Sequence, residues 1–132
     1  METKTVEYVD KSYDILVTVK QATLADQFKY DSASILATAK YGSDPLPVTG
    51  DGNESAEKWA ENWHMHNTFP AMRGAIVSIE NRDADKEEFP SVTSDGILQM
   101  PMEALDLILA AIYELNPNWS PFLKRAKKTG SG

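Results

Sequence analysis

The chain has 132 residues and no cysteine, and its hydrophobic fraction of 42% and charged fraction of 25% are typical of one globular domain. The lack of cysteine excludes disulfides, thiolate nucleophiles and thiolate zinc sites, and suits a reducing cytoplasm. The net charge is −7, but residues 1–123 hold 9 basic and 20 acidic side chains and therefore carry −11. We expect no nucleic-acid partner, because an acidic body repels phosphate, and no membrane association, because no apolar run approaches bilayer length.

Alternating apolar and polar residues near the amino terminus predict a β-hairpin. Val6 and Tyr8 form the apolar set of a first short strand, and Asp10-Lys11-Ser12 supplies a turn. The apolar set of the second strand is Tyr13, Ile15, Val17 and Val19. An isolated hairpin is only marginally stable, so this one must pack on helices or pair with another chain.

The next segment has the signals of a helix. Thr23 is a suitable amino-terminal cap with Asp26 three residues later, and Gly42 is suited to end the helix. Helical spacing places the following residues on one apolar face, which we predict to face the core: Ala25, Phe28, Ser32, Ile35, Leu36 and Ala39. The proline- and glycine-rich residues 43–53 predict a loop.

Two further helices are predicted around Pro70. The first covers Glu54–Asn67, and the second covers Pro70–Glu80 with Pro70 as its first residue. The first helix carries Ala56, Trp59, Ala60 and Trp63 on one face, with the tryptophans expected in the core. The second carries Met72, Ala75, Ile76 and Ile79 inward. A single helix kinked at Pro70 is the alternative, and the sequence does not separate the two.

The last predicted helix, Met102–Leu115, is the most apolar segment of the chain. It follows the charged loop Asn81–Ser94 and ends at Asn116-Pro117. Its inward residues are Leu105, Ile108, Leu109, Ile112 and Leu115, and Leu107 and Ala111 add a second apolar strip. Trp119 lies between two prolines, where it either folds back over this helix or contacts a partner.

These elements predict an α+β fold that is mainly α. An amino-terminal β-hairpin packs on three or four helices in a single globular domain of residues 1–123. Residues 124–132 contain four basic side chains and are predicted to form a flexible tail.

No residue pattern points to a reaction. Glu61 and His64 have the Glu-x-x-His spacing of di-iron bundles, but those sites need a second such motif and two more carboxylates. His64 and His66 diverge on a helix, and Glu87 and Glu88 sit in a charged loop that gives no desolvation. We therefore expect no catalytic residues, no metal and no cofactor, and a protein that is not an enzyme.

Two segments carry a resemblance to a known family. They are the helix start Gln21–Asp26 (QATLAD), which follows the hairpin, and the run Pro101–Trp119 (PMEALDLILAAIYELNPNW), which precedes a small basic tail. In this layout the chain resembles the tail assembly chaperones of long-tailed bacteriophages and prophages. The resemblance covers most of the chain in the order of its elements and rests on pattern rather than on an invariant motif.

The resemblance implies a small non-catalytic protein of the host cytoplasm that coats the tape measure protein before the tail tube protein polymerises. We also expect self-association into a homo-oligomer, because it would cover the exposed edge of the hairpin and the excess apolar surface of the last helix. The residues predicted to contact the client are Leu107, Ala111, Trp119 and Phe122. The alternative is an acidic inhibitor that blocks a nucleic-acid-binding partner, which requires carboxylates aligned on one surface.

Overall fold

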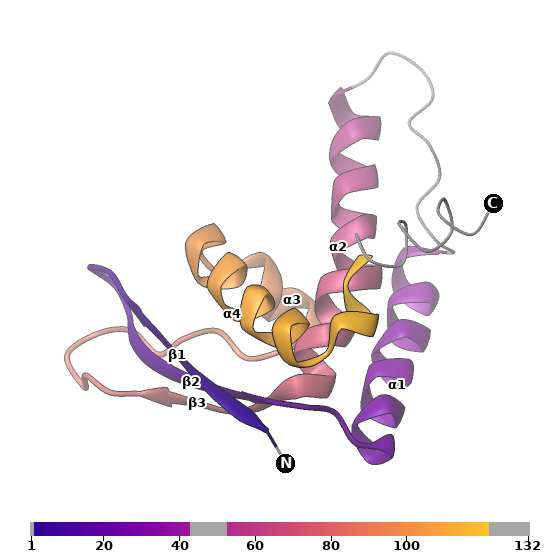
Figure 1. The fold of residues 1–132 in the computed structure, drawn as a ribbon. Coiled ribbons are helices and arrows are strands. Elements are labelled where there is room, and N and C mark those ends of the chain that lie inside the picture. The colour runs from indigo at the N-terminus through magenta and orange to yellow at the C-terminus, as the bar shows by residue number, and fades with distance from the viewer. Residues whose placement is uncertain (1, 43–52, 122–132) are drawn as a thin grey trace.

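The computed structural model describes residues 2–42 and 53–121, and Figure 1 shows their arrangement. The elements in chain order are β1 (Thr3–Val9), β2 (Asp14–Lys20), α1 (Leu24–Tyr41), α2 (Asn53–Ala75), β3 (Ile76–Asn81), α3 (Ser94–Leu98), α4 (Met102–Leu115) and the 3-10 turn η1 (Pro117–Trp119). The predicted fold class, α+β and mainly α, is confirmed. Most of the loop predicted at 43–53, Phe122 and the tail 124–132 lie outside the described residues.

The sheet has three antiparallel strands in the order β1-β2-β3. The predicted hairpin is confirmed, with Tyr8 opposite Ile15 and Val6 opposite Val17. Ile15, Val17 and Val19 are fully buried, while the alternate residues of β2 point to the other face and remain partly exposed. This alternation is that of an antiparallel sheet covered on one side, and α4 supplies the cover.

The third strand corrects the prediction around Pro70. Helix α2 runs without a break to Ala75 and contains Pro70, so the single-helix alternative holds. The predicted helix Pro70–Glu80 is wrong from Ile76 onward, because Ile76–Asn81 pairs with β2 as strand β3. The spacing of Ile76 and Ile79 fits a helix locally, but these residues pair along the second edge of β2 instead. A shift in register between Thr18 and Val19 accommodates the third strand.

Helix α1 begins and ends where predicted. The Thr23 hydroxyl and the Asp26 carboxylate form both hydrogen bonds of a capping box, and Gly42 has a positive φ of 86°. The predicted inward face is wrong: the buried residues are Asp26, Tyr30, Ala33 and Ala37. Small Ala33 and Ala37 allow α1 to pack closely against α2, which runs antiparallel to it in Figure 1.

Helix α2 contributes to the core only through its second half. Met65, Phe69 and Met72 are buried, whereas Trp59 is exposed, so the prediction that Trp59 lies in the core is wrong. In Figure 1 the first half of α2 extends away from the sheet. None of the helices in residues 2–42 and 53–121 has the length and apolarity needed to cross a membrane.

The carboxyl-terminal end of α4 is joined to the start of α1 by two side chains. Asn116 is buried; its Oδ1 accepts the Ala22 amide at 2.8 Å, and its Nδ2 donates to the Lys20 carbonyl at 2.9 Å. Trp119 is only 7% exposed, and its indole N–H donates to Gln27 Oε1 at 3.1 Å. Asn116 and Trp119 therefore hold α1 in place.

Candidate functional site

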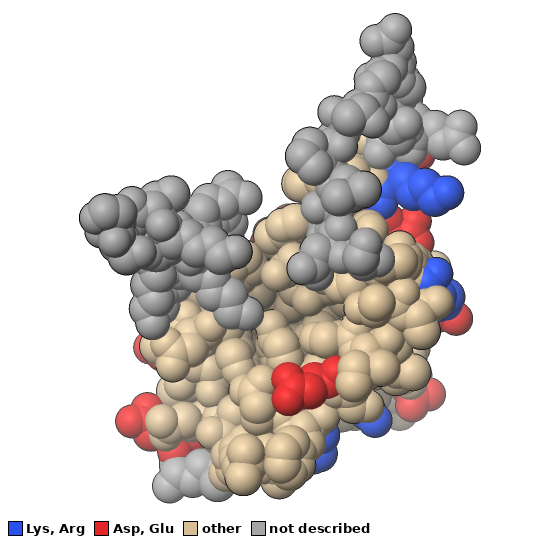
Figure 2. Space-filling model, turned by 90° about the vertical axis from the view of Figure 1, so that its right-hand side faces the viewer, with Lys and Arg blue, Asp and Glu red and all other residues tan. Residues whose placement is uncertain are grey.

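Helix α1 presents large apolar side chains to solvent. Leu24 is 71% exposed, Phe28 62%, Ile35 69% and Leu36 58%. These four residues are named here the α1 stripe. Because a helix turns by about 100° per residue, Leu24, Phe28 and Ile35 lie opposite the buried residues, and Leu36 lies at the flank nearer Ala33. The exposed Asp31 falls on the same face as the first three. Figure 2 shows this side of the molecule as a mainly uncharged surface, with one acidic group inside it and the other charged side chains toward its margin.

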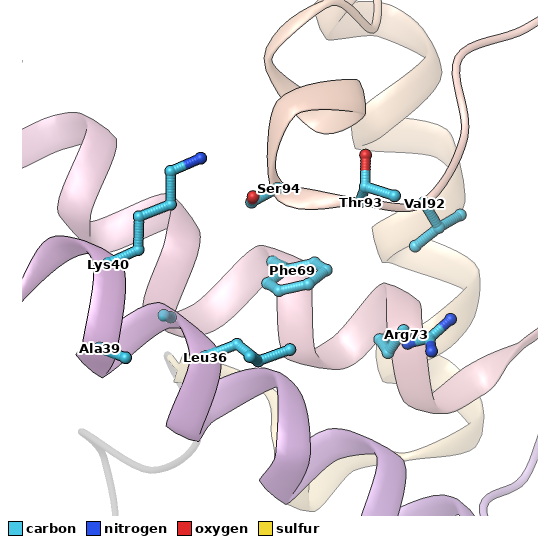
Figure 3. Close-up of a pocket in the computed structure, with 9 residues that line it drawn as sticks. Leu36, Ala39, Lys40, Phe69, Arg73, Val92, Thr93 and Ser94 are labelled. Carbon is cyan, nitrogen blue, oxygen red and sulfur yellow. The ribbon is translucent and has the colours of Figure 1, made fainter.

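The α1 stripe is continuous at Leu36 with an open cavity of about 470 Å³ between α1, α2 and the segment that leads into α3. We name this cavity the α1–α2 groove. Its lining residues are Leu36, Ala37, Ala39, Lys40, Phe69, Arg73, Val92, Thr93 and Ser94. Figure 3 shows Phe69 in the middle of the groove, with Lys40 toward one end and Arg73 toward the other. The groove therefore has an apolar floor and a basic group at each end.

The walls of the groove are held by local structure. Thr93 caps α3, and its hydroxyl accepts the Gly96 amide at 3.0 Å. Gly96 has no room for a side chain, because a Cβ there would lie 1.9 Å from the Ser91 carbonyl oxygen. Phe89 is buried and meets Tyr13 edge-to-face at 5.2 Å, which anchors the segment before the groove. The predicted charged loop Asn81–Ser94 is thus held to the domain at Phe89.

The two basic groups of the groove differ in their partners. Lys40 Nζ lies 3.0 Å from Asp95 Oδ1, and this hydrogen bond raises the pKa of Lys40. Both partners are at least half exposed, so the pair is weak and open to exchange. Arg73 lies in the last turn of α2 and is exposed, and its side chain has no hydrogen bond or ion pair to any residue in 2–42 or 53–121.

The residues predicted to contact a client do not gather at one place. Leu107 is 46% exposed on α4 and does not line the groove. Ala111 and Trp119 are buried, so their side chains are not offered to a partner in this fold. Of the two alternatives predicted for Trp119, the structure shows the one in which it folds back onto the domain. The aromatic ring that it contacts is that of Tyr30 on α1, and the two ring centroids are 4.7 Å apart. Phe122 lies outside the described residues.

The histidine and carboxylate motifs have structural partners. His64 Nδ1 lies 3.0 Å from the buried Thr68 hydroxyl, and burial lowers the pKa of His64. His66 Nε2 lies 2.9 Å from the Gly42 carbonyl oxygen, where it joins α2 to the end of α1. Within the described part of the chain, no group of three or more histidine, aspartate or glutamate side chains is arranged to hold a metal ion.

No protein-family model matches the chain, and no curated protein sequence or solved structure matches it either. Sequence reasoning found the apolar residues of α1 but assigned them to the core. One signal was available: Tyr30, Ala33 and Ala37 form a second face at helical spacing, and its small residues are suited to close helix packing.

Proposed function

We propose that this protein is a non-catalytic tail assembly chaperone of a long-tailed bacteriophage or prophage. In this proposal it covers an apolar helical segment of the tape measure protein with the α1 stripe and the α1–α2 groove. The observation that carries the proposal is the α1 stripe, whose four large apolar side chains are each more than half exposed on one helix. Large apolar side chains exposed together on one helix are a mark of an interaction site.

The shape of the surface favours a helical client. From Leu24 to Leu36 the stripe extends about 18 Å along α1, at 1.5 Å per residue. It is made of side chains on a helix and offers no free backbone edge, so it suits an amphipathic helix rather than an added strand. We take the tape measure client to be elongated, helical and partly apolar, and a chaperone of such a client needs apolar faces to cover it.

The firm attachment of α1 also supports the proposal. The helix is fixed by its capping box, by the contact of Trp119 with Tyr30 and by the Asn116 hydrogen bonds at its start. An exposed apolar stripe on a fixed helix is available to a partner without prior rearrangement, which lowers the entropic cost of binding.

The acidic-inhibitor alternative has less support. Such an inhibitor presents free carboxylates, but several in this chain are already paired with basic side chains. The paired carboxylates include Asp14 and Glu7 with Arg82, Asp26 with Lys20, Asp95 with Lys40 and Glu114 with Lys4. These pairs are also spread over several elements instead of forming one acidic surface.

Co-expression with the tape measure protein tests the proposal. We expect the wild-type chain to keep the tape measure protein in the soluble fraction and to co-elute with it. The double variant Phe28→Ser/Ile35→Ser should lose both effects while it melts like the wild type. Leu107→Ser is the control, because it removes an exposed apolar residue that belongs neither to the α1 stripe nor to the groove. Equal binding by the stripe variant and the wild type would contradict the proposal.

Self-association is a separate part of the expectation. Light scattering of the purified chain measures it, alone and with the client. If the α1 stripe is used for the client, the Phe28→Ser/Ile35→Ser variant should keep the oligomeric state of the wild type. A shift to monomer in that variant would instead place a second copy of the chain on the stripe.

A further inference from the structure

The groove has a charge pattern that is unusual for this chain. The molecule carries −7 overall, yet the two charged side chains that line the groove, Lys40 and Arg73, are both basic. They lie toward opposite ends of an apolar floor formed by Leu36, Phe69 and Val92 (Figure 3). Whatever occupies the groove therefore meets an apolar centre, with Arg73 on one side and the Lys40–Asp95 pair on the other.

The two ends are not equivalent. Lys40 is already paired with Asp95, whereas the Arg73 guanidinium has no partner within residues 2–42 and 53–121. Arg73 projects from α2 beside the apolar floor, so an occupant would displace water from around it. Removing water strengthens the attraction between a guanidinium and a carboxylate, and the planar guanidinium can hold both carboxylate oxygens.

From these observations we propose that the groove selects an amphipathic helix which carries an acidic residue one turn from its apolar anchor. The apolar anchor lies over Phe69, and the carboxylate reaches Arg73. Among residues 2–42 and 53–121, Arg73 has no partner whereas Lys40 is paired with Asp95, so we expect the client carboxylate at the Arg73 end, which sets the direction in which the client helix lies. The inference rests on the proposed function, since it names the chemistry of the client at the same surface.

Charge complementarity also argues against the chain's own tail as the occupant. The segment 124–132 contains Lys124, Arg125, Lys127 and Lys128 and no acidic residue. A basic segment placed beside Arg73 and Lys40 would be repelled, so the tail is a poor ligand for the groove.

Labelled helical peptides test the inference with the full chain. One fluorescein-labelled alanine-based peptide carries two leucines at i and i+4 and a glutamate at i+7, on the same face. A second peptide has lysine in place of the glutamate. Fluorescence anisotropy at low salt should show about fivefold tighter binding of the glutamate peptide, as expected for one favourable charge pair. The preference should shrink in 0.5 M NaCl.

Charge reversal supplies the decisive comparison. In Arg73→Glu the preference should invert, so that the lysine peptide binds more tightly. Lys11→Glu is the matched control, because it makes the same change in net charge in the β1–β2 turn, and it should keep the wild-type preference. Circular dichroism melts confirm that both variants are folded.

The outcomes separate the inference from the proposed function. If both peptides bind equally and Leu36→Asp abolishes binding of both, the apolar surface is used but the inference about Arg73 is overturned. If neither peptide binds at 1 mM protein, both the inference and the helix-covering function are overturned. If Arg73→Glu dissociates a dimer of the chain, the occupant is a second copy and the inference is again overturned.

Discussion

The two faces of α1 have the reverse of the usual amphipathic pattern. The buried face contains a carboxylate, a phenol and two alanines, at Asp26, Tyr30, Ala33 and Ala37. The exposed face contains the larger apolar side chains of the α1 stripe. Burying the stripe instead would remove more apolar area from water and favour folding. The present arrangement therefore leaves large apolar side chains in water, and the contacts of the buried face must hold the helix.

Those polar contacts are specific. Asp26 is 2% exposed, and its carboxylate accepts hydrogen bonds from the Thr23 amide and hydroxyl, each at 2.9 Å. Lys20 Nζ lies 2.9 Å from the same carboxylate. Burial opposes ionisation of Asp26, but the bonds from Thr23 and Lys20 outweigh burial and hold its pKa below the ordinary value. The buried face is thus fixed by the hydrogen bonds and the ion pair of Asp26, and the exposed face remains accessible to solvent.

The largest expected effect is on the buried face. Trp119→Ala removes the ring that packs on Tyr30 and the hydrogen bond to Gln27. We expect the free energy of unfolding to fall by about 3–5 kcal/mol, as for other buried aromatic truncations. Urea denaturation measures the loss. Trp59→Ala, on the exposed half of α2, is the control and should cost far less; equal losses would show that Trp119 does not fasten α1.

Asp26→Asn should destabilise the fold by about 2–3 kcal/mol near pH 7, because Lys20 and the capping bonds lose a charged partner. Asp31→Asn, at an exposed α1 carboxylate bonded to Gln27, is the control and should be nearly neutral.

The folded pKa of Asp26 is lowered from 3.8, so the stabilisation by Asp26 is present above pH 3.8 and is lost as pH falls through the folded pKa. The gap between wild type and Asp26→Asn in denaturation midpoint should therefore narrow only below pH 3.8.

Gly74→Ala tests how closely α2 approaches the tryptophan. A Cβ at Gly74 would lie 2.7 Å from Trp119 Cη2 and 3.2 Å from the Asp26 carbonyl oxygen. We expect a net loss of about 1–2 kcal/mol, because overpacking outweighs the helix propensity gained by alanine. In a Trp119→Phe background the ring is smaller, so the same change should cost less. Additive losses in the double variant would contradict the close contact.

The smallest stability effect is expected on the exposed face. Phe28→Ser should change the free energy of unfolding by about 0.5 kcal/mol or less, because the side chain stays largely in water in the folded state. Thermal melts in parallel with Tyr30→Ser, on the buried face, make the comparison direct. A large loss with Phe28→Ser would mean that the stripe packs within the folded chain.

Local signals in the sequence predicted the elements that depend on few neighbours. The hairpin follows from alternation around Asp10-Lys11-Ser12, and the ends of α1 follow from Thr23, Asp26 and Gly42. Such features are decided within a few residues by backbone geometry and capping. The fold class was therefore predictable, and so were the buried Ile108 and Ile112 of α4.

The candidate site was only partly predictable. The apolar residues of α1 are evident in the sequence, but their exposure is not, because an apolar face fits either a core or a partner. The groove joins Leu36, Phe69, Arg73 and Val92 from three separate segments, and no spacing rule brings them together.

The amino-acid sequence by itself determined where α1 begins and ends and that β1 and β2 form a hairpin, since those choices rest on short-range hydrogen bonds and alternation. Only the tertiary structure decided that Ile76–Asn81 is a strand, that Trp119 is buried against Tyr30, and that the α1 stripe faces solvent. In each of these cases two local conformations or two faces were acceptable, and long-range packing selected one of them.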